Sequence, residues 1–295
     1  MTTQHTPADP RTQYPSDQSV QQLDHPGLTD DMDSRPDHGE KTYRGSGRLE
    51  GKRAIVTGGD SGIGRAVALA FGREGADVAV VHLPEEQQDA DETLHLVKDA
   101  GRAGVSIAGD LRNEQFCREA VERAVAELGG LDVLVNNAAF QMQQEGVADF
   151  ATEQLERTFA TNVFALFWLC QAALPHLAPG SSIINTSSVQ AYQPKPGLMD
   201  YAATKAAIIN ITKSLSQELA EKGIRVNVVA PGPIWTPLIP ATMPPEEVDS
   251  FRTQSPLGRA GQPAECAGAY VFLASQESSF ITGERIGVTG GMPLP

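Results

Sequence analysis

The sequence predicts an α/β fold in which one doubly wound, parallel sheet of about seven strands carries helices on both faces. From residue 52 onward, short runs rich in β-branched residues alternate with stretches of helical periodicity. Strands that alternate with helices form βαβ units with right-handed crossovers, and such units build a parallel sheet. The runs 78–81 and 133–135 are apolar throughout, which is typical of strands buried on both faces.

Each expected element follows from its own local pattern. Helical periodicity from 64 to 74 stops at Gly75, and that from 114 to 128 stops at two glycines, residues that commonly end helices. The segments between such helices are short and apolar, as strands of a Rossmann-type domain are. The expected strands are 53–57, 77–83, 105–110, 132–138, 182–188, 225–230 and 285–289.

Two segments lie outside this pattern. Residues 1–49 contain five prolines, five glutamines and eight acidic residues and show no apolar periodicity. By themselves they bury too little apolar surface to offset the conformational entropy that is lost when a chain becomes ordered. They form either a disordered tail or an extended arm on another surface, and the globular domain is 50–295. The proline-rich segment 232–262 follows a strand end, where open α/β sheets bind ligands. We expect it to cover a substrate, with a short helix near 245–252.

Composition excludes several classes of function. The chain has 295 residues, a net charge of −14 and an isoelectric point near 4.8, which argues against binding nucleic acid or an anionic membrane. The longest apolar stretch, 163–174, is too short to span a bilayer. Three widely spaced cysteines suggest neither disulfides nor zinc, and the N-terminus lacks the features of a signal peptide. We therefore expect a cytoplasmic protein without a metal site.

A glycine-rich turn joins the first expected strand to the first helix. It reads Thr57-Gly-Gly-Asp-Ser-Gly-Ile-Gly64, with the spacing G-x-x-x-G-x-G. Glycines let the backbone turn sharply and approach a pyrophosphate, whose charge is stabilised at a helix N-terminus. A Walker P-loop is excluded because no Gly-Lys-Ser/Thr follows. The turn therefore favours a dinucleotide, although a glycine-rich turn alone is a weak signal.

Tyr201 and Lys205 are four residues apart in a helical pattern, so their side chains share one face. A free tyrosine, with a pKa near 10, transfers protons poorly at neutral pH. A nearby cation favours the phenolate, and Lys205 together with a positively charged nicotinamide could lower the pKa of Tyr201 toward 7. Ser188 lies thirteen residues before Tyr201, at the end of an expected strand.

Further motifs follow the later expected strands. Together with those above they are, in chain order, Thr57-Gly58-x-x-x-Gly62-x-Gly64, Asp110, Asn136-Asn137-Ala138-Ala139, Asn162, Ser188, Tyr201-x-x-x-Lys205 and Pro231-Gly232. With these motifs in this order, the chain resembles the short-chain dehydrogenase/reductase family over residues 50–292. Ala139 is a mild departure, since the family usually has glycine there.

The resemblance implies a role for each motif residue. Tyr201 is the general acid/base, Ser188 binds the substrate oxygen, Lys205 binds the nicotinamide ribose, and Asn162 positions a water for proton supply. The implied cofactor-binding residues are Gly58, Asp60, Ser61, Gly62, Ile63, Gly64, His82, Asp110, Leu111, Asn137, Ala138, Tyr201, Lys205, Pro231, Gly232, Ile234 and Thr236.

The cofactor preference depends on the end of the second strand. NAD-specific relatives carry an acidic residue there, but this chain has His82, which removes a charge that would repel a 2′-phosphate. No arginine replaces it at 82–84, and Asp60 adds negative charge nearby. NADP is therefore favoured, and NAD remains the alternative. The stretches 82–86 and 231–236 are similar to a bacterial subgroup described as general stress proteins or NADP-dependent aldehyde reductases.

The substrate segment carries large apolar residues, among them Trp235, Leu238, Ile239 and Met243. They favour a small apolar aldehyde, ketone or secondary alcohol. A non-catalytic redox sensor or stress protein is the alternative, but such proteins commonly lose a catalytic group that is present here. The resemblance also implies a homotetramer, whose neighbouring surfaces would order the arm from about Pro26 onward, while its first dozen residues stay mobile.

Overall fold

The computed structural model describes residues 7–294 and contains the predicted parallel sheet. Its seven strands are all parallel, in the order β3-β2-β1-β4-β5-β6-β7. The order reverses between β1 and β4, which opens a crevice at the carboxyl ends of the strands where such folds bind ligands. The strands are β1 Arg53–Thr57, β2 Asp77–His82, β3 Gly104–Ala108, β4 Leu131–Asn136, β5 Leu177–Thr186, β6 Arg225–Pro231 and β7 Arg285–Val288.

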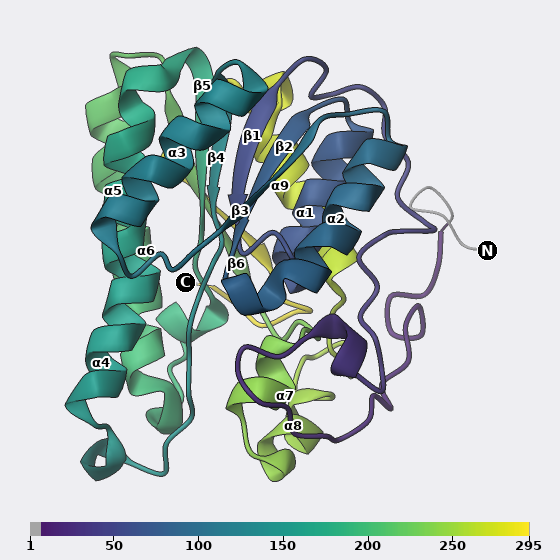
Figure 1. The fold of residues 1–295 in the computed structure, drawn as a ribbon. Helices are drawn as coiled ribbons and strands as arrows, with labels where there is room; N and C mark the ends of the chain where they lie inside the picture. The colour runs from purple at the N-terminus through teal and green to yellow at the C-terminus, as the bar shows by residue number, and fades with distance from the viewer. Residues whose placement is uncertain (1–6, 295) are drawn as a thin grey trace.

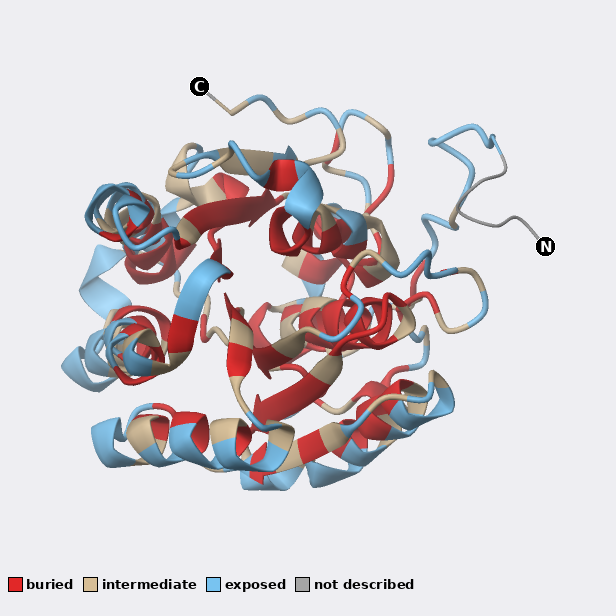
Figure 2. Cartoon of the chain, turned by 90° about the horizontal axis from the view of Figure 1, so that it is seen from above, coloured by how far each residue is buried: buried red, intermediate tan, exposed pale blue. Residues whose placement is uncertain are grey.

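Helices cover both faces of the sheet (Figure 1). On one face α1, α2 and α9 pack over a core of valines and alanines, and on the other α3, α5 and α6 pack over a second core. Figure 2 shows the buried strands between these two helical layers. The helices are α1 Gly62–Arg73, α2 Gln87–Asp99, α3 Glu114–Leu128, α4 Thr152–Phe159, α5 Ala165–Ala173, α6 Met199–Ala220, α7 Leu238–Thr242, α8 Pro245–Phe251 and α9 Pro263–Ala274.

The element boundaries agree with the predicted ones to within a few residues, with one larger difference. The strand expected at 182–188 begins at Leu177, because the start of β5 already pairs with Leu131 before the register shifts. The helix expected near 245–252 is α8, and α7 precedes it in the same segment.

The helical stretch Thr152–His176 meets the length and composition criteria for a membrane span, although half of its most apolar window is buried in the fold. The apolar run 163–174, which by itself is too short to span a bilayer, leaves out the helical turns that precede it and follow it. A helix in a protein core passes the same test, and α5 contributes Leu166, Leu169 and Cys170 to the core. We therefore interpret the stretch as a core helix.

The N-terminal arm lies against its own domain, and whether it also contacts a neighbouring subunit stays a prediction. Leu23 N donates to Pro240 O of α7 at 3.0 Å, and Trp235 Nε1 donates to Ser34 O at 2.7 Å. Met32 packs in one apolar cluster with Trp235. Figure 1 shows the arm, in purple, running beside α7 and α8. The first dozen residues are predicted to be mobile. Residues 1–6 of them lie outside the described chain.

A buried carboxylate fastens the end of the arm to α1. Glu74 accepts hydrogen bonds from Tyr43 Oη at 2.6 Å, from Ser46 N at 2.8 Å and from Arg48 Nη2 at 2.6 Å. Burial by itself would raise the pKa of Glu74, but the hydrogen bonds from Arg48 and Tyr43 lower it to about 2. The ionised form of Glu74 is therefore the one that the fold stabilises.

We expect Glu74→Gln to lower the free energy of unfolding at pH 7 by about 3 kcal/mol, because Arg48 loses its buried partner. A carboxyl whose folded pKa is depressed stabilises the fold above its unfolded pKa, and this contribution disappears as the pH falls from about 4.5 toward 2. Urea unfolding at pH 7 and pH 3 should therefore show a difference between the two proteins that shrinks in acid. The exposed Glu50→Gln is the control, and equal stabilities at pH 7 would contradict this account.

Candidate active site

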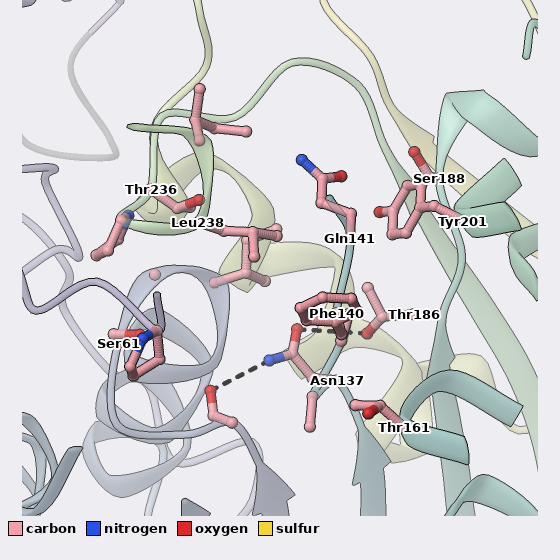
Figure 3. A pocket seen from close by; sticks show the side chains of 18 of the residues that line it. Ser61, Asn137, Phe140, Gln141, Thr161, Thr186, Ser188, Tyr201, Thr236 and Leu238 are labelled. Carbon is pink, nitrogen blue, oxygen red and sulfur yellow. Dashed lines mark hydrogen bonds between the residues drawn. The ribbon is translucent and has the colours of Figure 1, made fainter. Parts of the chain in front are cut away.

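The predicted site residues come together in one cavity at the carboxyl ends of the strands (Figure 3). Of the residues named above for catalysis and cofactor binding, all line it except Gly64 and Asn162. The walls come from the glycine turn, from the ends of β2 to β6, from α6 and from the α7–α8 segment. The predicted cofactor-binding residues and the predicted catalytic residues therefore line the same cavity.

The glycine turn has a backbone that only glycine accommodates. Gly58 and Gly62 have φ values of 59° and 49°, in the left-handed region. A Cβ on Gly64 would lie 1.8 Å from Gly58 O, so the start of α1 presses directly on the turn. Asn137 Nδ2 donates to Thr57 O at 3.1 Å and to Gly58 O at 3.2 Å, which ties the turn to the end of β4.

This turn fits the diphosphate of a dinucleotide. Ser61 caps α1 without a side-chain hydrogen bond to the helix, and the first intrahelical bond of α1 is from Arg65 N to Ser61 O. The amides of Gly62, Ile63 and Gly64 precede that bond at the positive end of the helix dipole. A Cβ on Gly62 would come within 3.0 Å of Thr236 Cγ2, so the α7 segment closes the cradle from the other side.

The catalytic candidates meet deeper in the cavity. Tyr201 and Lys205 project from the first turns of α6, and Ser188 follows β5. The Nζ of Lys205 lies 5.3 Å from the centroid of the Tyr201 ring and donates to Thr186 O at 2.9 Å. Figure 3 shows Ser188 beside Tyr201, and all three side chains are buried. The structure therefore brings the three groups together, and their catalytic roles stay predictions.

Burial dominates the electrostatics of this pair. It raises the pKa of Tyr201 to about 12, an effect that a hydrogen bond with Ser188 partly offsets. Burial also lowers the pKa of Lys205 to about 7. Lys205 alone therefore does not lower the pKa of Tyr201 toward 7, because desolvation outweighs it in the protein by itself. The expected lowering stays a prediction for the complex with an oxidised nicotinamide.

Asn162 lies behind the cavity and not on its wall. It sits in a π-helical turn, Ala160–Phe164, that interrupts the helix between α4 and α5. Its Oδ1 accepts from Phe140 N at 2.7 Å, and its Nδ2 donates to Phe140 O at 2.9 Å and to Thr204 Oγ1 at 3.0 Å. The side chain thus holds the loop that follows β4 against α6, and its role in positioning a water stays a prediction.

The end of β2 differs in detail from the expectation. His82 reaches the cavity, but Ser106 Oγ and Leu83 O occupy its two ring nitrogens at 2.8 and 2.7 Å. Burial lowers the pKa of His82, so its ring supplies no positive charge for a phosphate. Glu86 also lines the cavity, and burial together with the nearby Asp60 carboxylate raises the pKa of Glu86 to about 8.

Several lining residues carry no signal in the sequence. Gln141, which Figure 3 shows facing the cavity, donates to Thr242 Oγ1 at 3.0 Å. Other such residues come from the arm, from α4 and from the segments between elements, where neither spacing nor periodicity marks a site. They include His25, Pro26, Phe140, Arg157, Gln190 and Gln254.

Comparisons with known proteins support the resemblance. Residues 58–293 match the family model described as enoyl-(acyl carrier protein) reductase. Over 288 residues the chain is 54% identical to the oxidoreductase YghA of Escherichia coli, covering 97% of this chain and 98% of that protein. It is 51% identical over 279 residues to general stress protein 39 of Bacillus subtilis, covering 94% and 97% of the two chains.

A plant relative and a solved structure indicate which cofactor such proteins use. The chain is 46% identical over 272 residues to the NADPH-dependent aldehyde reductase 1, chloroplastic, of Arabidopsis thaliana, covering 90% of this chain and 94% of that protein. A short-chain dehydrogenase from Burkholderia cenocepacia, solved in complex with NADP, superposes with a TM-score of 0.78 at 35% identity, covering 83% of this chain and 98% of that one. The chain therefore belongs to the short-chain dehydrogenase/reductase family and is an NAD(P)-dependent oxidoreductase.

Proposed function

We propose that the protein catalyses reversible hydride transfer between NADP(H) and a small aldehyde, ketone or secondary alcohol. The observation that carries this proposal is the meeting of Ser188, Tyr201 and Lys205 in the cavity that the glycine turn also lines. The bound nicotinamide supplies the hydride. The glycine turn and the N-terminus of α1 would hold its diphosphate, and Lys205 would hold the adjoining ribose.

The protein's own residues orient the substrate and move the proton. Ser188 hydrogen-bonds the substrate oxygen, and the Tyr201 hydroxyl donates its proton to that oxygen during reduction or accepts it during oxidation. The high pKa that burial gives Tyr201 keeps the phenol protonated, which suits the reductive direction. The buried walls of the cavity exclude bulk water from this transfer.

The substrate end combines apolar walls with a few amides. Leu198, Leu238, Ile239, Met243 and Phe251 supply the apolar surface that favours a small apolar carbonyl compound. Gln141, Gln190 and Gln254 could in addition hydrogen-bond a hydroxyl group on such a substrate.

The preference for NADP has support from relatives and from charge. The Burkholderia structure and the ketoreductase LanV structure contain NADP, and the Arabidopsis relative is described as NADPH-dependent. In this chain no carboxylate ends β2, and the raised pKa of Glu86 leaves that neighbouring carboxyl largely protonated at pH 7. A 2′-phosphate would therefore meet little negative charge from Glu86.

We expect Tyr201→Phe to lower turnover with a carbonyl substrate by about a hundredfold or more, because the change deletes only the hydroxyl that carries the proton. Cofactor affinity, measured by quenching of protein fluorescence, should stay within about twofold of the wild-type value. Tyr192→Phe is the control, since this phenol does not line the cavity. A Tyr201→Phe enzyme with more than about a tenth of wild-type turnover would refute the assigned mechanism.

The cofactor preference should depend on pH through Glu86. As the pH rises from 7 to 9 across its pKa, Glu86 ionises, and the new charge should weaken NADPH relative to NADH by about threefold or more. Binding titrations at both pH values measure the ratio. Glu86→Gln should remove the pH dependence, and the exposed neighbour Glu85→Gln should leave it in place. The same ratio at both pH values in the wild type would be evidence against this role.

We also propose a cytoplasmic homotetramer that binds neither nucleic acid nor membranes, in keeping with the charge of the chain and its buried free thiols. Phe164 and Phe167 are 47% and 42% exposed, an unusual exposure for large apolar side chains on neighbouring helical turns. A second copy of the chain would cover them across a symmetric interface.

Light scattering should give a mass near four times the 31.4 kDa of one chain. The double substitution Phe164→Glu with Phe167→Glu should reduce that mass, because it places charges at the interface. Glu substitution of the exposed Phe280, which lies outside this helix in the segment before β7, should leave the mass unchanged. A monomeric wild-type protein would rule out the assembly.

A further inference from the structure

The arm contributes two residues to the wall of the cofactor cavity. His25 and Pro26 line it together with the glycine turn and the end of β2, although more than thirty positions separate them from either element in the sequence. These two residues belong to none of the family motifs found in the sequence. Their position therefore requires its own explanation.

Three hydrogen bonds, one before His25 and two after it, fix the arm on both sides of this residue. Leu23 N donates to Pro240 O on α7 at 3.0 Å. Thr29 donates from both its backbone N and its Oγ1 to Asp89 Oδ2 on α2, each at 2.9 Å, and Asp89 is paired with the buried Arg65 of α1. The segment 23–29 thus runs from the substrate-covering segment to the helices beside the glycine turn.

The turn between these hydrogen bonds, residues 25–27, also contacts Phe140 and Arg157 on the cavity wall. The His25 ring packs edge-on against Phe140 at 5.2 Å between centroids, and Arg157 Nη2 lies 3.2 Å from His25 Nδ1. The guanidinium of Arg157 stacks over the same Phe140 ring at 4.0 Å. The arm therefore runs from α7 to the loop that follows β4 and to α4.

The charged neighbours of His25 identify the half of the cavity that it covers. They are Arg157, Arg112, which follows β3, and Glu85, which follows β2. In this fold the adenosine ribose lies at the end of β2, so the neighbours Glu85 and Arg112 place His25 on the adenosine side of the cavity. Burial and the two arginines lower the pKa of His25 to about 4, so its ring is a neutral surface at pH 7.

The charge on this rim suits an anionic ligand. Within residues 7–294, Arg157 forms no ion pair; it contacts His25 and the Phe140 ring, and the nearby carboxylate of Asp110 is already paired with Arg112. The phosphates of a dinucleotide would supply the missing negative charge. His25 holds the guanidinium on the cavity wall, where it can meet such a group.

We propose that the arm turn 25–27 is part of the cofactor site and closes over the adenosine half of the bound dinucleotide. The inference rests on the proposed use of NADP(H) or NAD(H). It goes beyond that function because it makes cofactor retention depend on the arm. The dinucleotide then cannot leave until the turn moves away from Phe140, so the arm slows dissociation.

The test compares full-length His25→Ala with wild type. We expect the dissociation constants for NADPH and for NADH to rise by a similar factor of about ten, mainly through a faster dissociation rate. Fluorescence titration and stopped-flow displacement measure these quantities without any substrate. His95→Ala is the matched control, because this histidine is exposed on α2 and lies outside the cavity.

A second variant moves the turn while keeping His25. Gly27 has φ 83°, and a Cβ there would lie 2.9 Å from Pro237 O, so Gly27→Ala should displace the turn from α7 and speed dissociation in the same way. Wild-type dissociation rates in both folded variants would overturn the arm's role and leave the proposed function intact. A wild-type protein that binds neither cofactor would overturn both.

Discussion

The contact between the start of α1 and the turn after β1 constrains the whole site. Gly64 packs against the carbonyl of Gly58 so closely that no side chain fits between them, and Asn137 ties the same carbonyl to the end of β4. This contact brings the helix N-terminus to the point where the strand order reverses. The diphosphate cradle, the cavity floor and the approach of the α7 segment to Gly62 all depend on it.

Burial then sets the chemistry of the catalytic end. Tyr201 packs in the apolar cluster around Trp235, and Lys205 is buried against β5. Burial raises the pKa of Tyr201 and lowers the pKa of Lys205, so it favours the neutral form of both side chains. A neutral phenol is ready to donate a proton, and a bound positively charged nicotinamide would favour the phenolate needed for the reverse step. The arm contributes to this enclosure because Met32 and Leu23 pack in the same cluster.

The sequence was sufficient for the parts of the molecule that depend on local patterns. The parallel sheet followed from the alternating strand and helix patterns, and Tyr201, Lys205 and Ser188 followed from spacing within known motifs, whereas the order of the strands came from the structure. The path of the arm could not be predicted, because its contacts are scattered hydrogen bonds and isolated apolar side chains, such as the bond from Trp235 to Ser34 O and the packing of Met32, which leave no periodicity. The hydrogen bonds of Asn162 to Phe140 were also hidden, since they depend on a π turn that no residue pattern signals.

The most direct test of hydride transfer uses NADPH that carries deuterium at both C4 positions. The protein would be incubated with this cofactor and a panel of small aldehydes and ketones, and the alcohols analysed by mass spectrometry. The account predicts one deuterium on the carbinol carbon of at least one product, and loss of that product in Tyr201→Phe. Tight cofactor binding without deuterium in any product would contradict it and favour a non-catalytic dinucleotide-binding protein.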